Sequence, residues 1–532
     1  MNRAPVAQIS LGGWNVYFLG KLALYWQGFI GFQPLENLAF AALLLLPLQS
    51  QRWQRMRAMA AIPAAIGLLY HDSWLPPVSR VFSQASLLAQ FDLAYLVELT
   101  GRFINVQMAA LLIIIAVAYR LLSQWVRVGV LVLAVMVALL FTHTRASVNP
   151  LQGMAVAGNA NMPPQAAAKP QSLDDVAHDF FASEAKRRVA FSVPAANATP
   201  FDIIFVHICS LSWDDLRAVG LDSHPLWKHL DITLTHFNSA ASYSGPAVIR
   251  MLRAPCGQPR HEALYSPAPE GCYLMEDLRQ AGFESNLALN HDGHFEDFLK
   301  LVQQQRINQT PLSLDNIPVT QHAFDDSPIF DDFAVLSRWL QDRKKDHAAR
   351  AALFYNTISL HDGNKTNGAG MGRNSHDTYK ARLERLLDDL DHFMGVLETS
   401  GTKAVVVLIP EHGAAYRGDR MQIAGLREIP SPAITLVPVG IKVVGGGVRR
   451  AGEPAVVAES TSYLALSRIV ANLLKKSPFS GDGFNAGDYL ADLPVTPLLS
   501  QNGEVTMMHY NNQYYLRQEN NGPWTPYDPG GP

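Results

Sequence analysis

The sequence predicts an α/β protein in two unlike parts, an N-terminal bundle of about five transmembrane helices and a larger outer α/β domain. Hydrophobic residues make up 48% of the 532 residues and are concentrated in the first third. Beyond Phe201, short apolar β-rich runs alternate with helical patterns, which favours a mostly parallel sheet flanked by helices. We therefore expect a helical domain over 1–144, a linker and connecting helix over 145–200, and the outer domain over 201–532.

Five apolar stretches are candidates for crossing a bilayer. They are Trp14 to Ile30, Leu35 to Leu48, Met59 to Tyr70, Gln107 to Leu122 and Val128 to Phe141. The second and third are short for a span, so they could also be buried or re-entrant helices. The amphipathic segment Ser83 to Leu99 is expected to lie along the outer interface, with an additional buried helix as the alternative.

The arginines near these stretches predict which way the bundle is oriented. They precede the first stretch or lie between the second and third and between the fourth and fifth: Arg3, Arg52, Arg55, Arg57, Arg120 and Arg127. Because positively charged loops stay in the cytoplasm, an odd number of spans carries everything after Phe141 outside. No cleavable signal peptide is visible, so the first span should remain as an anchor.

The segment after the bundle indicates a tether followed by a helix. From Arg145 to Pro170 the sequence is rich in Ala, Asn, Gln, Pro and Gly and has no apolar periodicity. Ser172 to Arg188 is predicted as a helix, because Ser172 can cap it and acidic residues fill its first turn.

The outer domain is predicted as five buried strands with helices between them, followed by a hairpin around Asn511 and Asn512. The strands are expected over Asp202 to Ser210, Glu284 to Asn290, Ala351 to Leu360, Lys403 to Pro410 and Ala433 to Val444. The helices are expected over Tyr273 to Ala281, His294 to Gln305, Ile329 to Asp342, Asp377 to Thr399 and Ser460 to Lys475.

The stretch SAASYSGPAVIRML, Ser239 to Leu252, places Ser244 at the start of a predicted helix that Gly245 and Pro246 open. A hydroxyl there faces free backbone N–H groups and the positive end of the helix dipole, where a phosphate can bind while the serine attacks it. Taken alone, this segment favours the simpler interpretation that Ser244 is an N-cap. The nucleophile hypothesis depends on the other residues of the site.

Candidate metal ligands follow three predicted strands. Cys209 ends the first strand, His361 follows the strand that ends in NTISL, and Glu411 and His412 follow KAVVVLIP. Each residue alone has an ordinary structural explanation, but the carboxyl ends of parallel strands share one edge of a sheet. A thiolate, an imidazole and a carboxylate suit zinc, whereas calcium or magnesium would favour oxygen ligands. With Ser244 as fourth ligand, the metal would lower the pKa of the hydroxyl.

The chain has three cysteines, and their positions assign them to different roles. Cys256 and Cys272 bracket a loop rich in proline and glycine in an oxidising compartment, so we expect a disulfide between them. Cys209 then remains free to bind metal.

These residues resemble a known family. The chain resembles the alkaline phosphatase superfamily in three features: a nucleophile that opens a helix, a metal ligand that ends the first strand, and the PEHG run. The N-terminal bundle resembles that of the membrane-anchored phosphoethanolamine transferases in this superfamily. The lipid A-modifying branch has a threonine nucleophile, an acidic first ligand and an Asp-His pair, whereas this chain has Ser244, Cys209 and Glu411 with His412. With HICSLSWDDL and SYSGPAVIRMLR, the set resembles the cellulose-modifying branch.

The resemblance implies an alkaline-phosphatase-like α/β sandwich in the bacterial periplasm, anchored in the inner membrane. It implies that Ser244 takes phosphoethanolamine from phosphatidylethanolamine and passes it to the glucose 6-hydroxyl of nascent cellulose, in biofilm matrix production. Other cellulose synthase subunits would be partners. The resemblance also implies that zinc is held by Cys209, Ser244, Glu411 and His412. Tyr243 and His361 would line the site, and His361 would contact the phosphoryl group or assist proton transfer.

Other functions are possible for a chain of this kind. A sulfatase shares the fold, but Val248 stands where its signature requires arginine. A transferase of phosphoethanolamine or phosphoglycerol to another envelope glycan or lipid stays open, as does a structural subunit of a polysaccharide export complex. The intact candidate ligand set argues against a degenerate site. The net charge of -3 gives no basic footprint for nucleic acid.

Overall fold

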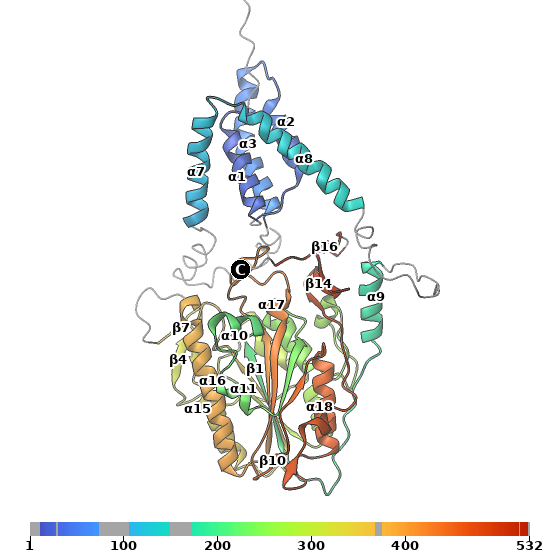
Figure 1. Cartoon of the computed structure of the whole chain (residues 1–532). Coiled ribbons are helices and arrows are strands. Elements are labelled where there is room, and N and C mark those ends of the chain that lie inside the picture. The colour runs from blue at the N-terminus through green and yellow to red at the C-terminus, as the bar shows by residue number, and fades with distance from the viewer. Residues whose placement is uncertain are drawn as a thin grey trace, which may run out of the picture.

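The computed structural model describes residues 11–27, 30–73, 106–148, 172–367, 375–520 and 522–529. Figure 1 shows a group of N-terminal helices at one end of a larger α/β domain. The segment Ser83 to Leu99 and most of the predicted tether lie outside the described residues.

The N-terminal helices coincide with the five predicted stretches. They are α1 (Trp14–Trp26), α2 (Pro34–Leu45), α3 (Gln51–Asp72), α7 (Val106–Leu122) and α8 (Val128–Val148). Two boundaries were wrong: α3 begins at Gln51 and so contains the arginines expected in a loop, and α8 runs past Arg145, where the tether was expected to begin. Among the described residues, no helix is both long and apolar enough to span a bilayer.

The connecting helix α9 (Leu173–Glu184) confirms the predicted cap but ends before Arg188. The Ser172 hydroxyl accepts a hydrogen bond from the Asp175 amide at 3.1 Å, and the Asp175 carboxylate accepts one from the Ser172 amide at 3.3 Å. This capping box satisfies amide groups that a helix start leaves unpaired.

A seven-stranded sheet forms the centre of the outer domain, in the order β11-β2-β9-β8-β1-β6-β3. Only β9 is antiparallel to its neighbours, so the predicted mostly parallel sheet is confirmed for the described residues. The strands β2 and β11 were not anticipated. The seven strands are β1 (Asp202–Cys209), β2 (Ile232–Asn238), β3 (Glu284–Leu289), β6 (Ala351–Thr357), β8 (Ala404–His412), β9 (Leu436–Val444) and β11 (Ala455–Val457).

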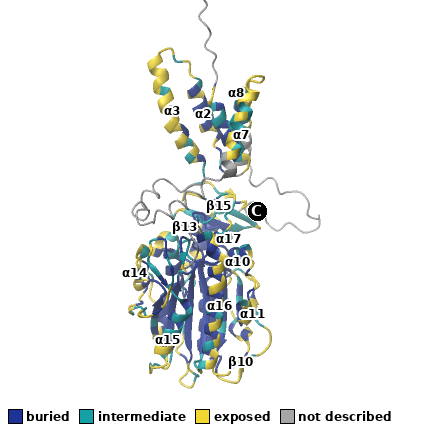
Figure 2. Ribbon diagram, turned by 90° about the vertical axis from the view of Figure 1, so that its left-hand side faces the viewer, coloured by how far each residue is buried: buried dark blue, intermediate teal, exposed yellow. Residues whose placement is uncertain are grey.

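Helices cover both faces of this sheet, and its central strands β1, β6 and β8 are buried along their whole length (Figures 1 and 2). Because side chains alternate along a strand, Ile203 and Phe205 pack into one layer while Ile204 and Val206 pack into the other. One layer contains α12 (Ser244–Leu252), α13 (Leu274–Gln280), α14 (Phe298–Gln304) and α18 (Tyr463–Lys475). The other contains α10 (Trp213–Val219), α11 (Pro225–His229), α15 (Asp332–Arg343) and α16 (Ser375–Ser400).

At two predicted helices, another element occupies the expected first residues. The helix predicted from Ile329 begins at Asp332, because β5 (Pro328–Phe330) instead pairs with β4 (Val319–His322), which also pairs with β7 (Lys365–Thr366). The helix predicted from His294 begins as a 3₁₀ turn, η2 (Phe295–Asp297), and becomes α-helical only in α14.

The C-terminal hairpin is confirmed. β14 (Val505–Tyr510) and β15 (Gln513–Arg517) are joined by Asn511 and Asn512, whose φ angles of 49° and 59° suit a type I′ turn. β13 (Leu499–Asn502) and β16 (Thr525–Pro526) complete that sheet. The remaining short elements are η1 (His261–Tyr265), α17 (Pro432–Thr435), β10 (Arg449–Arg450), β12 (Gly483–Phe484) and η3 (Ala486–Tyr489).

Candidate active site

The predicted site residues meet at the carboxyl edge of the central sheet. Cys209 ends β1, Glu411 and His412 end β8, and Cys209 lies opposite His412 in the register of these neighbouring strands. The strand β8 therefore continues two residues beyond the predicted Pro410. This edge of the sheet faces the N-terminal helices in Figure 1.

Three side chains at this edge form a group that fits a metal ion. One ligand atom each from Cys209, Glu411 and His412 lies within 4.8 Å of the other two, and all three residues are buried. Among the described residues, neither Glu411 Oε2 nor His412 Nε2 has a hydrogen-bond partner. His412 Nδ1 lies 2.9 Å from the carbonyl oxygen of Gly413, to which it can donate. The Nε2 lone pair is then left for a metal, and the sulfur, oxygen and nitrogen donors suit zinc.

The electrostatics of this group favour a bound cation. Burial raises the pKa of the Cys209 thiol, and the charge of Glu411 raises it further. Burial also acts to raise the pKa of Glu411, but His207 and His412 outweigh burial and hold that pKa well below its usual value. Burial, with the charge of Arg427, lowers the pKa of His412 to about 3. A metal cation would compensate the buried carboxylate and stabilise the thiolate.

Ser244 lies beside the metal group. Its Oγ is 3.3 Å from Cys209 Sγ, and it is the first residue of α12. Tyr243 occupies the N-cap position and makes no side-chain capping bond there. The sequence interpretation of Ser244 as an N-cap was therefore wrong by one residue, and its hydroxyl lies at the start of the helix next to the candidate ligands.

Tyr243 and His361 line two different hollows near Ser244. The Tyr243 hydroxyl donates to Glu428 Oε1 at 2.8 Å, and the Arg427 guanidinium lies 5.4 Å from the Tyr243 ring centre. His361 Nδ1 lies 2.6 Å from the carbonyl oxygen of Asp362, and its side chain lines a small cavity together with Ser244. Burial, reinforced by Arg427, lowers the pKa of His361 to about 4, so its imidazole is neutral near pH 7.

Supporting residues that sequence reasoning missed hold Glu411 in place. Asn356 Nδ2 donates to Glu411 Oε1 at 2.7 Å, and His207 Nδ1 lies 3.2 Å from the same oxygen. His291 Nε2 contacts Asn356 Oδ1 at 2.9 Å. Asn356 and His207 interrupt otherwise apolar strands near their carboxyl ends, and that interruption was the signal that could have identified them. Arg427 lies in an irregular segment before α17, so no periodic pattern pointed to it.

The glycine of the PEHG run has a steric role. A Cβ on Gly413 would lie 2.7 Å from the Ser212 side chain and 2.9 Å from Asp215 Oδ2. The Asp215 carboxylate accepts hydrogen bonds from the Ala414 amide at 2.7 Å and from the Ser212 amide at 2.9 Å. This close approach fixes the segment that follows His412.

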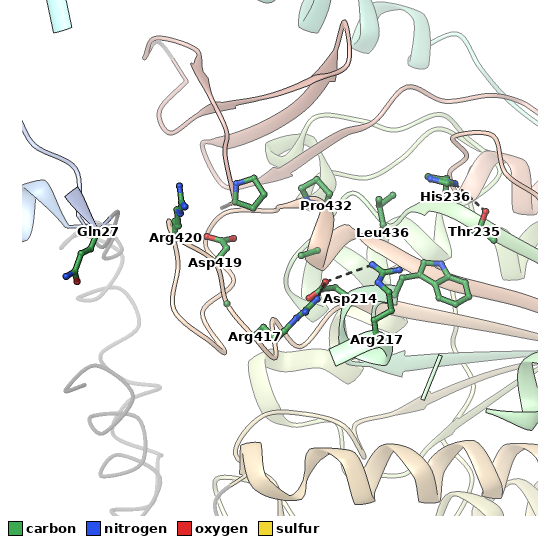
Figure 3. A pocket seen from close by; sticks show the side chains of 14 residues that line it. Gln27, Asp214, Arg217, Thr235, His236, Arg417, Asp419, Arg420, Pro432 and Leu436 are labelled. Atoms are coloured by element: carbon green, nitrogen blue, oxygen red, sulfur yellow. Dashed lines mark hydrogen bonds and ion pairs between the residues drawn. The ribbon is translucent and has the colours of Figure 1, made fainter. Parts of the chain in front are cut away.

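A larger hollow of about 880 Å³ lies apart from the metal group, next to the N-terminal helices (Figure 3). Gln27 and Trp213 contribute to its lining, and Asp214 accepts a hydrogen bond there from Arg417 at 2.6 Å. None of the three candidate metal ligands lines this hollow. The candidate metal group therefore lies at the sheet edge and not in this hollow.

The cysteine assignment is confirmed. Cys256 and Cys272 form a disulfide with a Cα–Cα distance of 5.2 Å, and Cys209 is free and buried.

Comparison with known proteins places the chain in a family. Residues 14–141 match the sequence model of the "Cellulose biosynthesis protein BcsG N-terminal domain", and residues 158–524 match that of the "Cellulose biosynthesis protein BcsG C-terminal domain". The chain belongs to the BcsG family. It is 42% identical to the cellulose biosynthesis protein BcsG of Escherichia coli K12, over 97% of this chain and 96% of that protein. It is also 42% identical to BcsG of Salmonella typhimurium LT2, again over 97% and 96% of the two chains.

Solved structures were also compared with this BcsG family member. The zinc complex of the C-terminal periplasmic domain of EcEptC from Escherichia coli gives a TM-score of 0.43 at 13% identity, covering 59% of this chain and 93% of that one. The soluble domain of lipooligosaccharide phosphoethanolamine transferase A from Neisseria meningitidis gives 0.40 at 13% identity, covering 54% and 93%.

Proposed function

We propose that this chain is a zinc-dependent phosphoethanolamine transferase. It takes phosphoethanolamine from phosphatidylethanolamine and transfers it, through a covalent serine intermediate, to glucose 6-hydroxyls of nascent cellulose in the biofilm matrix. The observation that carries the proposal is the buried Cys209, Glu411 and His412 group with the Ser244 hydroxyl 3.3 Å from the cysteine sulfur. The cellulose acceptor is supported by membership of a cellulose biosynthesis family.

Cys209, Glu411 and His412 would hold the zinc, with Ser244 as fourth ligand. Zinc bound there supplies a Lewis acid that lowers the pKa of the serine hydroxyl. The protein residues orient the site: Asn356 and His207 fix the Glu411 carboxylate, and the Gly413 carbonyl fixes the His412 ring.

The reaction is an exchange in two steps. Ser244 Oγ bonds to phosphorus while the bond from phosphorus to the glycerol oxygen breaks. The proton that the serine loses passes to that oxygen, and diacylglycerol leaves as an alcohol. A glucose 6-oxygen then bonds to phosphorus, the bond to Ser244 Oγ breaks, and the serine regains a proton. His361 is neutral near pH 7 and lines the same small cavity as Ser244. When its Nδ1 donates to the Asp362 carbonyl, its Nε2 carries a lone pair that can accept a proton from the incoming hydroxyl. Arg427 supplies positive charge for the phosphoryl oxygens.

A lipid donor requires that the site be near a membrane, and we place the chain in the bacterial inner membrane with the α/β domain in the periplasm. The N-terminal helices expose large apolar side chains, among them Trp26 at 68%, Ile66 at 65% and Ile113 at 65%. The sheet edge at which Cys209 and His412 end their strands, next to Ser244, faces these helices (Figure 1). Other subunits of the cellulose synthase complex are proposed partners.

The test is the intact mass of the purified, zinc-loaded full-length chain after incubation with phosphatidylethanolamine vesicles. We expect one phosphoethanolamine adduct on Ser244 and none on Ser244→Ala. Adding a soluble cello-oligosaccharide should remove the adduct and give the modified sugar. An adduct formed only from phosphatidylglycerol would instead indicate a phosphoglycerol transferase. The absence of any adduct would favour a structural role in polysaccharide export.

A further inference from the structure

Two neighbouring hollows meet at one carboxylate beside the proposed nucleophile. A small cavity of about 40 Å³ is lined by Ser244, His361 and Glu296 among other residues. A wider hollow of about 410 Å³ is lined by Tyr243 and again by Glu296. Glu296 therefore lies at the boundary between the space next to Ser244 and the more open hollow.

The other carboxylates of the small cavity already have a basic partner. Asp292 lies 2.5 Å from His294 Nδ1, and Asp325 lies 3.0 Å from His294 Nε2. In the wider hollow, Asp297 lies 3.8 Å from the Lys300 ammonium.

Glu296 differs from these carboxylates. Within the described residues, no basic side chain forms an ion pair with it. Desolvation raises the pKa of its carboxyl group, the charge of Arg427 lowers it, and the charge of Glu411 raises it again, with a net raised pKa. The residue is also partly open to solvent, so a small cation that replaced water in the cavity would lie next to a carboxylate with no basic partner.

Aromatic rings form a second element of the same cavity. The ring centres of Phe295 and Phe324 are 4.7 Å apart with an edge-to-face arrangement, and the Phe324 ring centre lies 5.5 Å from that of His361. Both phenylalanines line the cavity with Ser244. Aromatic faces together with a carboxylate attract ammonium groups, because the ring quadrupole and the negative charge act in the same direction.

The backbone holds Glu296 in an unusual conformation. Its φ angle is +50° and that of Asp297 is +55°, so two successive residues with side chains adopt the left-handed region. Few residues other than glycine do so, and such conformations concentrate at functional sites. They place Glu296 just ahead of α14, at the cavity.

We propose that Glu296, together with Phe295 and Phe324, forms the subsite that binds the ammonium group of the transferred phosphoethanolamine. This inference rests on the proposed function and deepens it, because it explains how the site selects an aminoethyl phosphoester over an uncharged one. The wider hollow beyond Glu296 leaves room for the alcohol that enters or leaves.

The test compares two soluble p-nitrophenyl phosphodiesters, one carrying a 2-aminoethyl group and the other an uncharged propyl group. Both are assayed with the zinc-loaded full-length protein. Glu296→Gln should lower kcat/KM for the aminoethyl ester by about ten- to a hundredfold, as expected for losing a charged contact, and change that for the propyl ester little. Glu296→Asp, which keeps the charge, should regain part of the preference.

Asp297→Asn is the matched control, because Asp297 is the next residue, shares the left-handed conformation and pairs with Lys300. It should keep the preference of the wild type. Zinc content and thermal melting should be unchanged in all three variants, since Glu296 and Asp297 are exposed residues and replacing their side chains removes no core packing. A Glu296→Gln protein that keeps the preference, or loses activity equally on both esters, would overturn the subsite. A wild type that uses neither ester in this assay and forms no serine adduct from lipid would instead refute the proposed function.

Discussion

The N-terminal helices and the outer domain differ in how many large apolar side chains they expose. On the helices, Trp26 is 68% exposed, while the ammonium of Lys21 lies buried against the Asp72 carboxylate at 2.5 Å. In the outer domain, Phe205 and Phe354 are fully buried, and Figure 2 shows the middle of the sheet as buried. Both regions bury an apolar core, but the N-terminal helices also expose many large apolar side chains.

The two regions also differ in whether their buried polar groups have hydrogen-bond partners. Lys21, Asp72 and Asn37 satisfy one another: Lys21 Nζ donates to Asn37 Oδ1 at 2.8 Å, and Asn37 Nδ2 donates to Asp72 Oδ2 at 2.8 Å. At the sheet edge, Glu411 Oε2 and His412 Nε2 have no hydrogen-bond partner among the described residues. We infer that the first cluster serves the packing of the helices and the second serves a ligand.

The largest expected effect tests whether the cluster at the sheet edge binds zinc and takes part in the reaction. Ser244→Ala should lower transfer by more than about a thousandfold, because it removes the nucleophile. It should keep most of its zinc, since three ligands remain and water can take the fourth position. Cys209→Ala and His412→Ala should lose both zinc and activity. His361→Ala should keep zinc and transfer slowly.

Metal analysis, thermal melting and turnover of a phosphoethanolamine ester by the full-length protein measure these outcomes together. A folded, zinc-loaded Ser244→Ala protein that turns over at the wild-type rate would remove Ser244 as nucleophile.

The next effect tests whether the cluster of Lys21, Asp72 and Asn37 stabilises the packing of the N-terminal helices. Lys21→Met leaves the Asp72 carboxylate buried without its cation, which should cost about 3–5 kcal/mol of unfolding free energy. The double variant Lys21→Met/Asp72→Leu removes both charges and should be less destabilised than Lys21→Met alone. Denaturation of the full-length protein in detergent measures both. If Lys21→Met alone melts with the wild type, the buried ion pair does not hold the helices together.

The two regions also differ in how far the sequence predicted them. The N-terminal helices and the main strands could be predicted because runs of apolar residues are a local signal in the sequence. Cys209, Glu411 and His412 could be predicted as a group because the ends of parallel strands share one edge of a sheet. The reversed β9 and the strand β2 were missed, since pairing partners distant in sequence determine strand direction. Asn356 and Arg427 were missed because their roles depend on which side chains the fold brings to Glu411 and Tyr243.

A smaller effect tests the support of the metal group. Asn356→Ala removes the 2.7 Å hydrogen bond to Glu411 Oε1 and should weaken zinc binding by about ten- to a hundredfold, the usual effect of losing an outer hydrogen bond to a ligand. Asn286→Ala is the control: it lies on β3, where its side chain accepts a hydrogen bond from Trp339 at 2.9 Å, and it should leave zinc affinity unchanged. Competition with a zinc chelator measures the affinities. Equal zinc affinity in Asn356→Ala and the wild type would exclude this supporting role.

The smallest effect concerns α9, the helix through which the chain enters the outer domain. The Asp174 carboxylate accepts a hydrogen bond from Arg517 at 2.8 Å, and Phe180 and Phe181 pack near Met508, so α9 is attached to the C-terminal hairpin independently of its cap. Ser172→Ala should therefore fray only the first turn and cost about 1 kcal/mol.

Ser172→Gly should cost only a few tenths of a kcal/mol, since glycine is tolerated at an N-cap. Faster hydrogen exchange of the Asp175 amide in Ser172→Ala, measured beside its melting curve, would locate the change, because the Ser172 hydroxyl accepts that amide's hydrogen bond. If Ser172→Ala also lowered zinc affinity, α9 would be coupled to the sheet edge. The interpretation that α9 is peripheral and that the metal site does not depend on it would then be wrong.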